Sequence, residues 1–295
     1  MKFRVLLVPA VMTALCLTAC SAGCNCNGNS GSGWTSMSYS NSDDANPIIA
    51  SNNIVSRNVN VNSFKKIRSN GFIDVEYIAD PSVSSPVVTV QGPDNVIDRI
   101  TVKTDGSVLN VGVKERTSIK FKGSDVADKM KVVVKYKDVS SFITSGSGDF
   151  DISGNFAGQN SLEIKTAGSG DVDLKGNITL GQLKIVTAGS GDVEFENGLL
   201  KCNKFIISTA GSGDVEIKSV EADEIQASTS GSGDMKLTGN TRLVALSSSG
   251  SGDINASSLT ALTGSAYASG TASIRCNVKD LSSKSSGMAS IDNRR

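Results

Sequence analysis

Residues 142–152 read FITSGSGDFDI, and versions of this stretch recur through the second half of the chain. Its centre, Gly-Ser-Gly-Asp, occurs six times at intervals of 19 to 22 residues. The six aspartates are Asp149, Asp171, Asp192, Asp214, Asp234 and Asp253. Two degenerate copies follow, ending at Ser273 and Ser290. A repeat of this length is typical of a solenoid, in which each repeat packs only against its neighbours.

The residues on both sides of the motif alternate in the same way in every copy. The position after each Asp and the position two further on are apolar, as in Val193 and Phe195, and a polar residue such as Glu194 stands between them. Ahead of the first Gly, an aliphatic residue and then a Thr or Ser occupy alternate positions in most copies, as in Ile185 and Thr187. A period of two predicts a strand with one inward and one outward face. Each repeat therefore supplies two strands around a corner.

These patterns predict an all-β fold, a parallel β-helix (β-solenoid) with coils of about 20 residues. Coils stack ~4.8 Å apart, so that like residues form columns. Propeller blades need about 40 residues, about twice this repeat. We expect Gly-Ser-Gly-Asp coils over residues 146–291 and less regular strands over 54–145, including a hairpin at Asp105-Gly106. Together they form one β-helix domain, residues 54–295.

The N-terminus resembles a bacterial lipoprotein signal peptide. Lys2 and Arg4 precede a 13-residue apolar run, which ends in Leu17-Thr18-Ala19-Cys20, the lipobox of that class. The resemblance implies a signal peptide over residues 1–19, acylation of Cys20 and a membrane anchor. Because Ser21 rather than Asp follows Cys20, it also implies an outer-membrane lipoprotein, on the periplasmic face or the cell surface.

The segment after the lipobox, residues 20–53, is rich in Ser, Gly and Asn. Such a composition buries little apolar surface, so we expect a flexible tether. Cys24 and Cys26 lie in it without a second pair to complete a metal site. The other two mature cysteines, Cys202 and Cys276, lie in the solenoid about three coils apart, ~14 Å, which is beyond the reach of a disulfide. We expect both to be buried thiols.

Composition excludes several function classes. Lys plus Arg and Asp plus Glu both number 29, so the chain lacks the basic surface that a nucleic acid requires. There is no histidine, which excludes Ser-His-Asp and Cys-His catalysis and His-bound zinc.

One family resemblance combines these features. Arg57, the run Phe64-Lys65-Lys66-Ile67, the run Gly71–Glu76 and the Gly-Ser-Gly-Asp repeats together resemble the putative auto-transporter adhesin head GIN domain family over roughly residues 57–280. The resemblance implies a β-helical, secreted or lipid-anchored protein of the bacterial envelope, and it provides no catalytic residue. We expect a non-enzymatic surface module for adhesion to a glycan or protein ligand. The alternative is a carbohydrate-active β-helix enzyme, a polysaccharide lyase or hydrolase.

The aspartates are the candidate site. Strand parity places the repeated Asp and the acid two residues on, as in Asp149 and Asp151, on the outer surface in two columns. Either each Asp caps its own turn as an acceptor of backbone N–H groups, or the columns bind Ca²⁺. The calcium candidates, where both columns are acidic, are Asp171, Asp173, Asp192, Glu194, Asp214 and Glu216. Catalysis requires carboxylates in different environments, which a uniform column does not provide. We therefore predict no catalytic or cofactor-binding residue, and Cys20 as the lipidation site.

Overall fold

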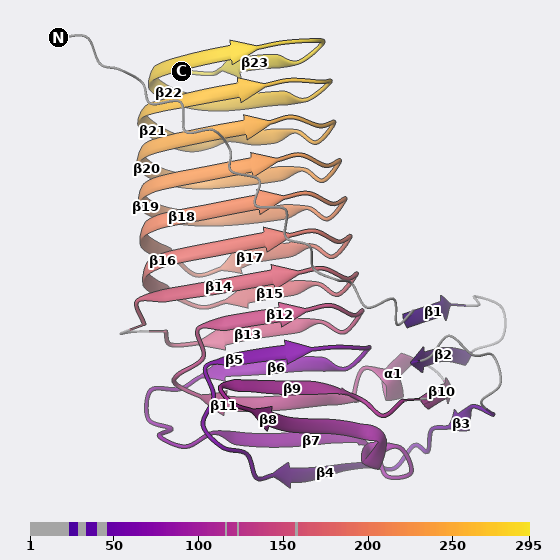
Figure 1. Cartoon of the computed structure of the whole chain (residues 1–295). Helices are drawn as coiled ribbons and strands as arrows, with labels where there is room; N and C mark the ends of the chain where they lie inside the picture. Colours follow the sequence, from indigo (N-terminus) through magenta and orange to yellow (C-terminus); the bar gives the residue numbers. More distant parts are fainter. Residues whose placement is uncertain (1–23, 29–33, 40–45, 116, 123, 157–158) are drawn as a thin grey trace.

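The computed structural model describes residues 24–28, 34–39, 46–115, 117–122, 124–156 and 159–295. Within these ranges, 19 strands join in one continuous sheet that winds into a β-solenoid of about seven turns, with coils about 21 residues apart (Figure 1). The predicted all-β class and the solenoid are confirmed.

Each coil has one strand before the Gly-Ser-Gly-Asp corner and one after it. A second corner then leads to the next coil, and from β19 onward a single long strand bends through that second corner (Figure 1). The coils are formed by β12 (Ser141–Thr144), β13 (Phe150–Gly154), β14 (Ser161–Thr166), β15 (Val172–Lys175), β16 (Ile178–Thr187), β17 (Val193–Asn197), β18 (Leu200–Thr209), β19 (Val215–Thr229), β20 (Met235–Ser248), β21 (Ile254–Ala268), β22 (Ser273–Ser285) and β23 (Ser290–Asn293).

Neighbouring coils pair in parallel and place like residues on like residues. Ile164 pairs with Ile185 and Ile185 with Ile207, and all three are fully buried. The Thr residues two positions on, such as Thr187, are also buried, at the inner side of the corner. The predicted inward and outward parity is therefore confirmed. Cys202 and Cys276 are buried free thiols, as expected, and burial raises the pKa of Cys202 to about 11.

The corner requires glycine because successive coils approach closely there. A Cβ atom on Gly168 would lie 1.8 Å from the carbonyl oxygen of Gly146, and one on Gly170 would lie 2.2 Å from that of Gly148. Both distances are far inside a van der Waals contact, so any side chain would force the coils apart. The second corner uses glycine differently, since Gly154 and Gly176 have positive φ angles of 105° and 94°.

The first coil lies far from the repeats in sequence. β5 (Lys66–Ser69) pairs in parallel with β12, and β6 (Asp74–Ala79) pairs in parallel with β13, about 75 residues further along. Gly71, in the turn between β5 and β6, and Asp74, the first residue of β6, have the spacing of the first Gly and the Asp of the motif. The solenoid therefore begins at Lys66, before the first complete motif.

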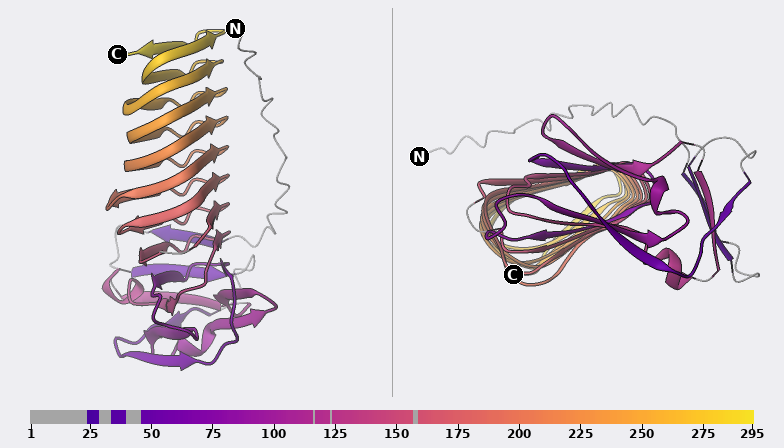
Figure 2. Two further views of the ribbon diagram at one scale, coloured as in Figure 1. Left: turned by 90° about the vertical axis from the view of Figure 1, so that its left-hand side faces the viewer. Right: turned by 90° about the horizontal axis from the view of Figure 1, so that it is seen from below.

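An N-terminal cap covers this first coil (Figure 2). β11 (Lys131–Tyr136) pairs in parallel with β6, and β9 (Val108–Val113) pairs in parallel with β5. β8 (Ile100–Asp105) forms the predicted hairpin with β9 around Gly106, while β7 (Val87–Pro93) pairs antiparallel with both β11 and β4 (Ile54–Val59). Two short helices, η1 (Ile97–Arg99) and α1 (Ser124–Ala127), complete the cap.

The segment expected to be a tether contains strands. β1 (Cys24–Gly28), β2 (Trp34–Tyr39) and β3 (Ile48–Ile49) form a four-stranded sheet with β10 (Thr117–Lys122) in the order β1-β2-β10-β3. The structure here differs from the expectation based on composition, because strand pairing requires only backbone N–H and C=O groups, and β10 provides an edge for them. The predicted signal peptide and Cys20 lie outside the described residues.

No helix in the described part of the chain is both long and apolar enough to span a membrane.

Candidate functional site

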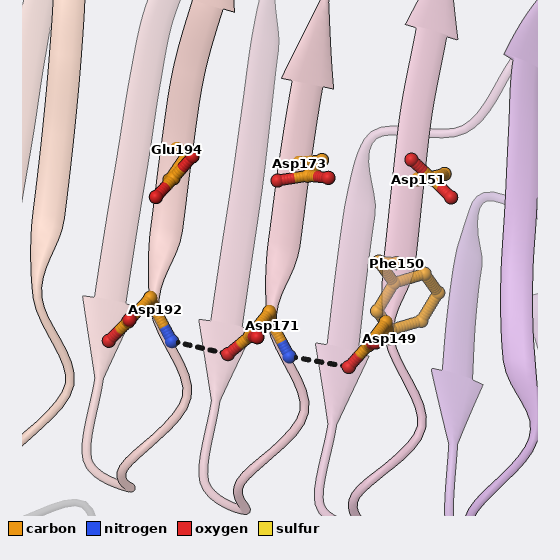
Figure 3. Close-up of a pocket in the computed structure, with 7 residues that line it drawn as sticks. All are labelled: Asp149, Phe150, Asp151, Asp171, Asp173, Asp192 and Glu194. Atoms are coloured by element: carbon orange, nitrogen blue, oxygen red, sulfur yellow. Dashed lines mark hydrogen bonds between the residues drawn. The ribbon is translucent and has the colours of Figure 1, made fainter. Parts of the chain in front are cut away.

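Two columns of carboxylates run along the corner side of the solenoid. The first column is formed by the motif aspartates, each directly before the strand that follows the corner, and the second by the acid two residues further on (Figure 3). The paired strands set this arrangement, because Asp151 lies beside Asp173, and Asp173 beside Glu194, in the parallel register. The predicted columns are therefore present, on the outer surface.

The first column is a continuous chain of hydrogen bonds between coils. The backbone N–H of Asp171 donates to Oδ1 of Asp149 at 2.8 Å, and that of Asp192 donates to Oδ1 of Asp171 at 2.8 Å (Figure 3). The same bond recurs at each later rung to Asp253, with N–O distances of 2.7 to 2.8 Å. The column begins at Asp74, which accepts from Asp149, and ends at Ser273, which donates to Asp253.

The geometry of the corner explains this chain. The carbonyl oxygen of Gly148 lies 2.2 Å from where a Cβ atom of Gly170 would be and accepts from the Thr144 hydroxyl at 3.4 Å, whereas the N–H of Asp171 donates to a carboxylate and not to a backbone carbonyl. The Asp149 carboxylate takes the place of that missing backbone acceptor. The first of the two alternatives placed this hydrogen bond within each turn. The carboxylate does accept a backbone N–H, but from the coil above.

Asp74 is a member of the column that the motif search missed. Its turn reads Gly-Phe-Ile-Asp, in which Ile73 replaces the second glycine. Only the spacing of Gly71 and Asp74 matches the repeat. A search for Gly-x-x-Asp before an alternating strand would have found it.

The second column is partly neutralised by lysines. Lys175 Nζ lies 2.6 Å from Asp151 and 3.5 Å from Asp173, and Lys236 Nζ lies 2.7 Å from Glu216. At the first coil, Lys131 pairs with Glu76 at 2.6 Å. Pairs as exposed as these contribute at most about 1 kcal/mol each, so they reduce repulsion along the column more than they stabilise the fold.

The lower end of the columns holds the most perturbed carboxyl groups. Burial, with added repulsion from Asp149 and Asp151, raises the pKa of Asp74 from 3.8 to about 6. Burial also raises the pKa of Asp149, and burial followed by repulsion from Glu196 raises that of Glu194. In contrast, the hydrogen bond from Lys236 lowers the pKa of Glu216.

Between the two columns lies a hollow of about 210 Å³. Its lining is almost entirely acidic, and is formed by Asp149, Phe150, Asp151, Asp171, Asp173, Asp192 and Glu194 (Figure 3). Lys175 faces two acids beside it, but the hydrogen-bonded column continues past without a break. The hollow therefore provides negative charge and carboxylate oxygens in nearly repeating surroundings.

The six calcium candidates do not converge on one point. Asp171, Asp192 and Asp214 each already use Oδ1 to accept a backbone N–H. Among the described residues, no group of three or more Asp, Glu or Cys side chains is arranged to hold a metal ion. Ca²⁺ prefers six to eight oxygens at ~2.3–2.6 Å, and calcium binding by these six residues stays a prediction.

The sequence profile of one family, described as putative auto-transporter adhesin, head GIN domain, matches residues 63–201 and 196–293. The chain belongs to this family. The head GIN domain thus spans the solenoid and most of the N-terminal cap, as the motifs had indicated. No curated protein matches the chain.

Solved structures share this head GIN fold. A putative adhesin from Parabacteroides merdae superposes with a TM-score of 0.71 at 19% identity, covering 85% of this chain and all of the other. A putative adhesin from Parabacteroides distasonis superposes with a TM-score of 0.72 at 20% identity, covering 84% of this chain and all of the other. A structure from the same organism, described as a putative lipid binding protein, superposes with a TM-score of 0.59 at 20% identity, covering 85% of this chain and all of the other. At these identities the likeness shows the fold, and none of these three is described by an enzymatic activity.

Proposed function

We propose that this protein is an outer-membrane lipoprotein, anchored through Cys20, whose solenoid presents a rigid, non-enzymatic surface for adhesion to a glycan or protein ligand. The observation that carries the proposal is the uninterrupted hydrogen-bonded column from Asp74 to Ser273 in a chain of the head GIN family. Every coil from Asp74 to Asp253 presents the carboxylate of the first column in the same hydrogen bond. Such a surface suits multivalent contact, whereas catalysis requires one coil to differ from the rest.

The anchor is supported by the sequence Leu17-Thr18-Ala19-Cys20 after a short apolar run. Acyl chains on Cys20 would hold the protein at the membrane without a spanning segment. Mass spectrometry of the native N-terminus tests this directly, with Cys20→Ser as the altered chain. We expect a diacylated or triacylated Cys20 in the native protein, and an unprocessed or soluble product from the variant. A native chain that begins at another, unmodified residue would contradict the anchor.

The adhesive role is tested by a binding screen of the native protein against glycan and matrix-protein arrays, with and without Ca²⁺. We expect saturable binding to one ligand class. The same arrays are then examined by mass spectrometry for cleaved glycans. Ligand cleavage at a rate that depends on Asp149 or Asp171 would favour the carbohydrate-active alternative instead.

A further inference from the structure

The two ends of the solenoid differ in how many strands cover them. At the N-terminal end, β9 and β11 pair with the first coil and β7, β8 and β4 continue beyond them. At the C-terminal end, β23 is the last strand among the described residues, and it pairs only with Ser273–Cys276 of β22. Leu281 and Ile291 are therefore only partly buried at the end of the apolar core, and Met288 is 81% exposed. An uncapped end of a repeat array is normally an interaction surface or a cause of aggregation.

Asn293 hydrogen-bonds the backbone at one point of this end. The side-chain amide of Asn293 donates to the carbonyl oxygen of Val278 at 2.9 Å and accepts the Val278 N–H at 3.0 Å. Beyond Val278 the rest of β22 pairs with β21 alone. We call residues Lys279–Ser285 the open edge.

The backbone of the open edge is ready to accept another strand. Ser286 N–H donates to the carbonyl oxygen of Ala268 in the coil below. Because N–H directions alternate along a strand, the N–H groups of Leu281 and Ser283 point away from β21, toward the free side. A neighbouring strand would satisfy them.

The side chains of the open edge match a second copy of the same edge. Asp280, Ser282 and Lys284 are exposed and project from the outer face, in the columns of Thr263, Ser265 and Tyr267 below them. In the described part of the chain, neither Asp280 nor Lys284 has an ion-pair partner. In an antiparallel pair centred on Ser282, each Asp280 would lie opposite the Lys284 of the other copy. That register also makes Leu281 and Ser283 a hydrogen-bonded pair, in agreement with their free N–H groups.

We infer that the open edge is a dimerisation surface, through which two copies join end to end by antiparallel pairing of β22 about Ser282. The join would continue the sheet of one solenoid into the other and would cover the exposed ends of both cores, including Leu281. The arrangement has two-fold symmetry, so it closes at two copies and does not propagate into a filament.

Cysteine crosslinking of the full chain in the cells that produce it tests the contact. Ser282→Cys places two thiols on the two-fold axis, where facing Cα atoms of a non-hydrogen-bonded pair lie ~4.5 Å apart, within the range of a disulfide. Ser265→Cys is the matched control, since Ser265 pairs with Ser282 from one coil below. Under mild oxidation we expect a covalent dimer from Ser282→Cys, beyond the background that the unsubstituted chain gives, and none from Ser265→Cys.

Charge reversal provides an independent readout in the Ser282→Cys chain. Asp280→Lys alone or Lys284→Asp alone places like charges opposite each other twice and should abolish the dimer band. The two changes together restore opposite charges and should restore the band, which a folding defect would not do.

Equal crosslinking of Ser282→Cys and Ser265→Cys, or failure of the double reversal to restore the band, would overturn the inference. A Ser282→Cys product whose mass shows a different protein would also overturn it, and would assign the open edge to that partner. None of these results bears on whether Cys20 is acylated or whether the solenoid is adhesive.

Discussion

The N-terminal cap and the coils above it are built from the same kind of strand but are held together by contacts of different range. In the coils, each strand pairs with the strand about 21 residues away, and one set of columns repeats throughout. At the cap, β11 pairs with β6 of the first coil, nearly 60 residues away, and the ring of Tyr136 in β11 packs against that of Phe64 at 5.3 Å. Repetition stabilises the shaft of the molecule, whereas only irregular, long-range packing closes its end.

If the columns are the basis of coil stability, substitutions of inward and outward residues within one strand must have very different effects on the free energy of unfolding. Val193→Asp would bury an unpaired charge in the apolar column and should cost about 3–5 kcal/mol of unfolding free energy. Glu194→Lys, on the outer face one residue later, should cost less than about 0.5 kcal/mol because the side chain is partly exposed. Urea denaturation followed by circular dichroism measures both. Equal losses would contradict the parity of the columns.

Replacing a glycine should destabilise the coils more than the cap. Gly170→Ala places a Cβ atom against the carbonyl of Gly148 and should cost about 2–3 kcal/mol, because backbone cannot yield as a side chain does. In the cap, Gly106 has a φ of 54° and open space around it, so Gly106→Asn should cost less than about 1 kcal/mol. Denaturation midpoints measure the difference. A small loss of stability in Gly170→Ala would mean that the spacing between coils can adjust.

The Asp74 rung, which joins the first coil to the next one, should make stability depend on pH. The pKa of Asp74 is raised to about 6 in the folded protein, so the folded state binds the proton more tightly than the unfolded chain does. The stability due to this group is therefore full below pH ~4 and lost as the pH rises to ~6. Asp74→Asn keeps the Oδ1 acceptor for Asp149 and should stabilise the protein at pH 7 by about 1–3 kcal/mol.

The control for this measurement is Asp80→Asn. Hydrogen bonds from Ser82 lower the pKa of Asp80, so its replacement should give no gain at pH 7. Denaturation midpoints at pH 4 and pH 7 distinguish the two. If the gain of Asp74→Asn were the same at both pH values, titration of Asp74 would not be its cause.

Removing one acceptor from the middle of the column should have a smaller effect. Asp192→Ala leaves the N–H of Asp214 without its partner and should cost about 1 kcal/mol, since water can replace the carboxylate at this exposed corner. Asp192→Asn retains an oxygen at the same place and should be neutral or slightly stabilising. Thermal melts compare the two variants, and a loss as large with Asn as with Ala would show that charge, not the hydrogen bond, matters.

Calcium should have the smallest effect. Because the first-column carboxylates already accept backbone N–H groups, the wild-type protein should melt at the same temperature in millimolar Ca²⁺ and in chelator. Specific binding at a hundredfold excess over Kd would stabilise the fold by ~2.7 kcal/mol, a shift in melting temperature of about 5–10 °C. Such a shift, lost in Asp192→Asn with Asp214→Asn, would establish the site that the sequence left open.

The repeat determined the solenoid by itself, because each coil contacts only the coils beside it. Alternation around Val193 therefore predicted burial, and the spacing of the aspartates predicted two outer columns. The glycines of the corner were also predictable, although only the structure distinguishes close approach at Gly170 from a positive φ at Gly176.

Only the tertiary structure determined which distant strands pair and which groups meet in hydrogen bonds between coils. The pairing of β5 and β6 with coils about 75 residues away depends on how the cap folds, so no local pattern indicated it. The strands at Cys24–Gly28 and Trp34–Tyr39 depend on the edge that β10 provides, not on their own composition. The role of each carboxylate depended on which N–H the corner leaves without a backbone acceptor. The hydrogen bond from that N–H joins residues of two different coils, so only the stacking of the coils determines it.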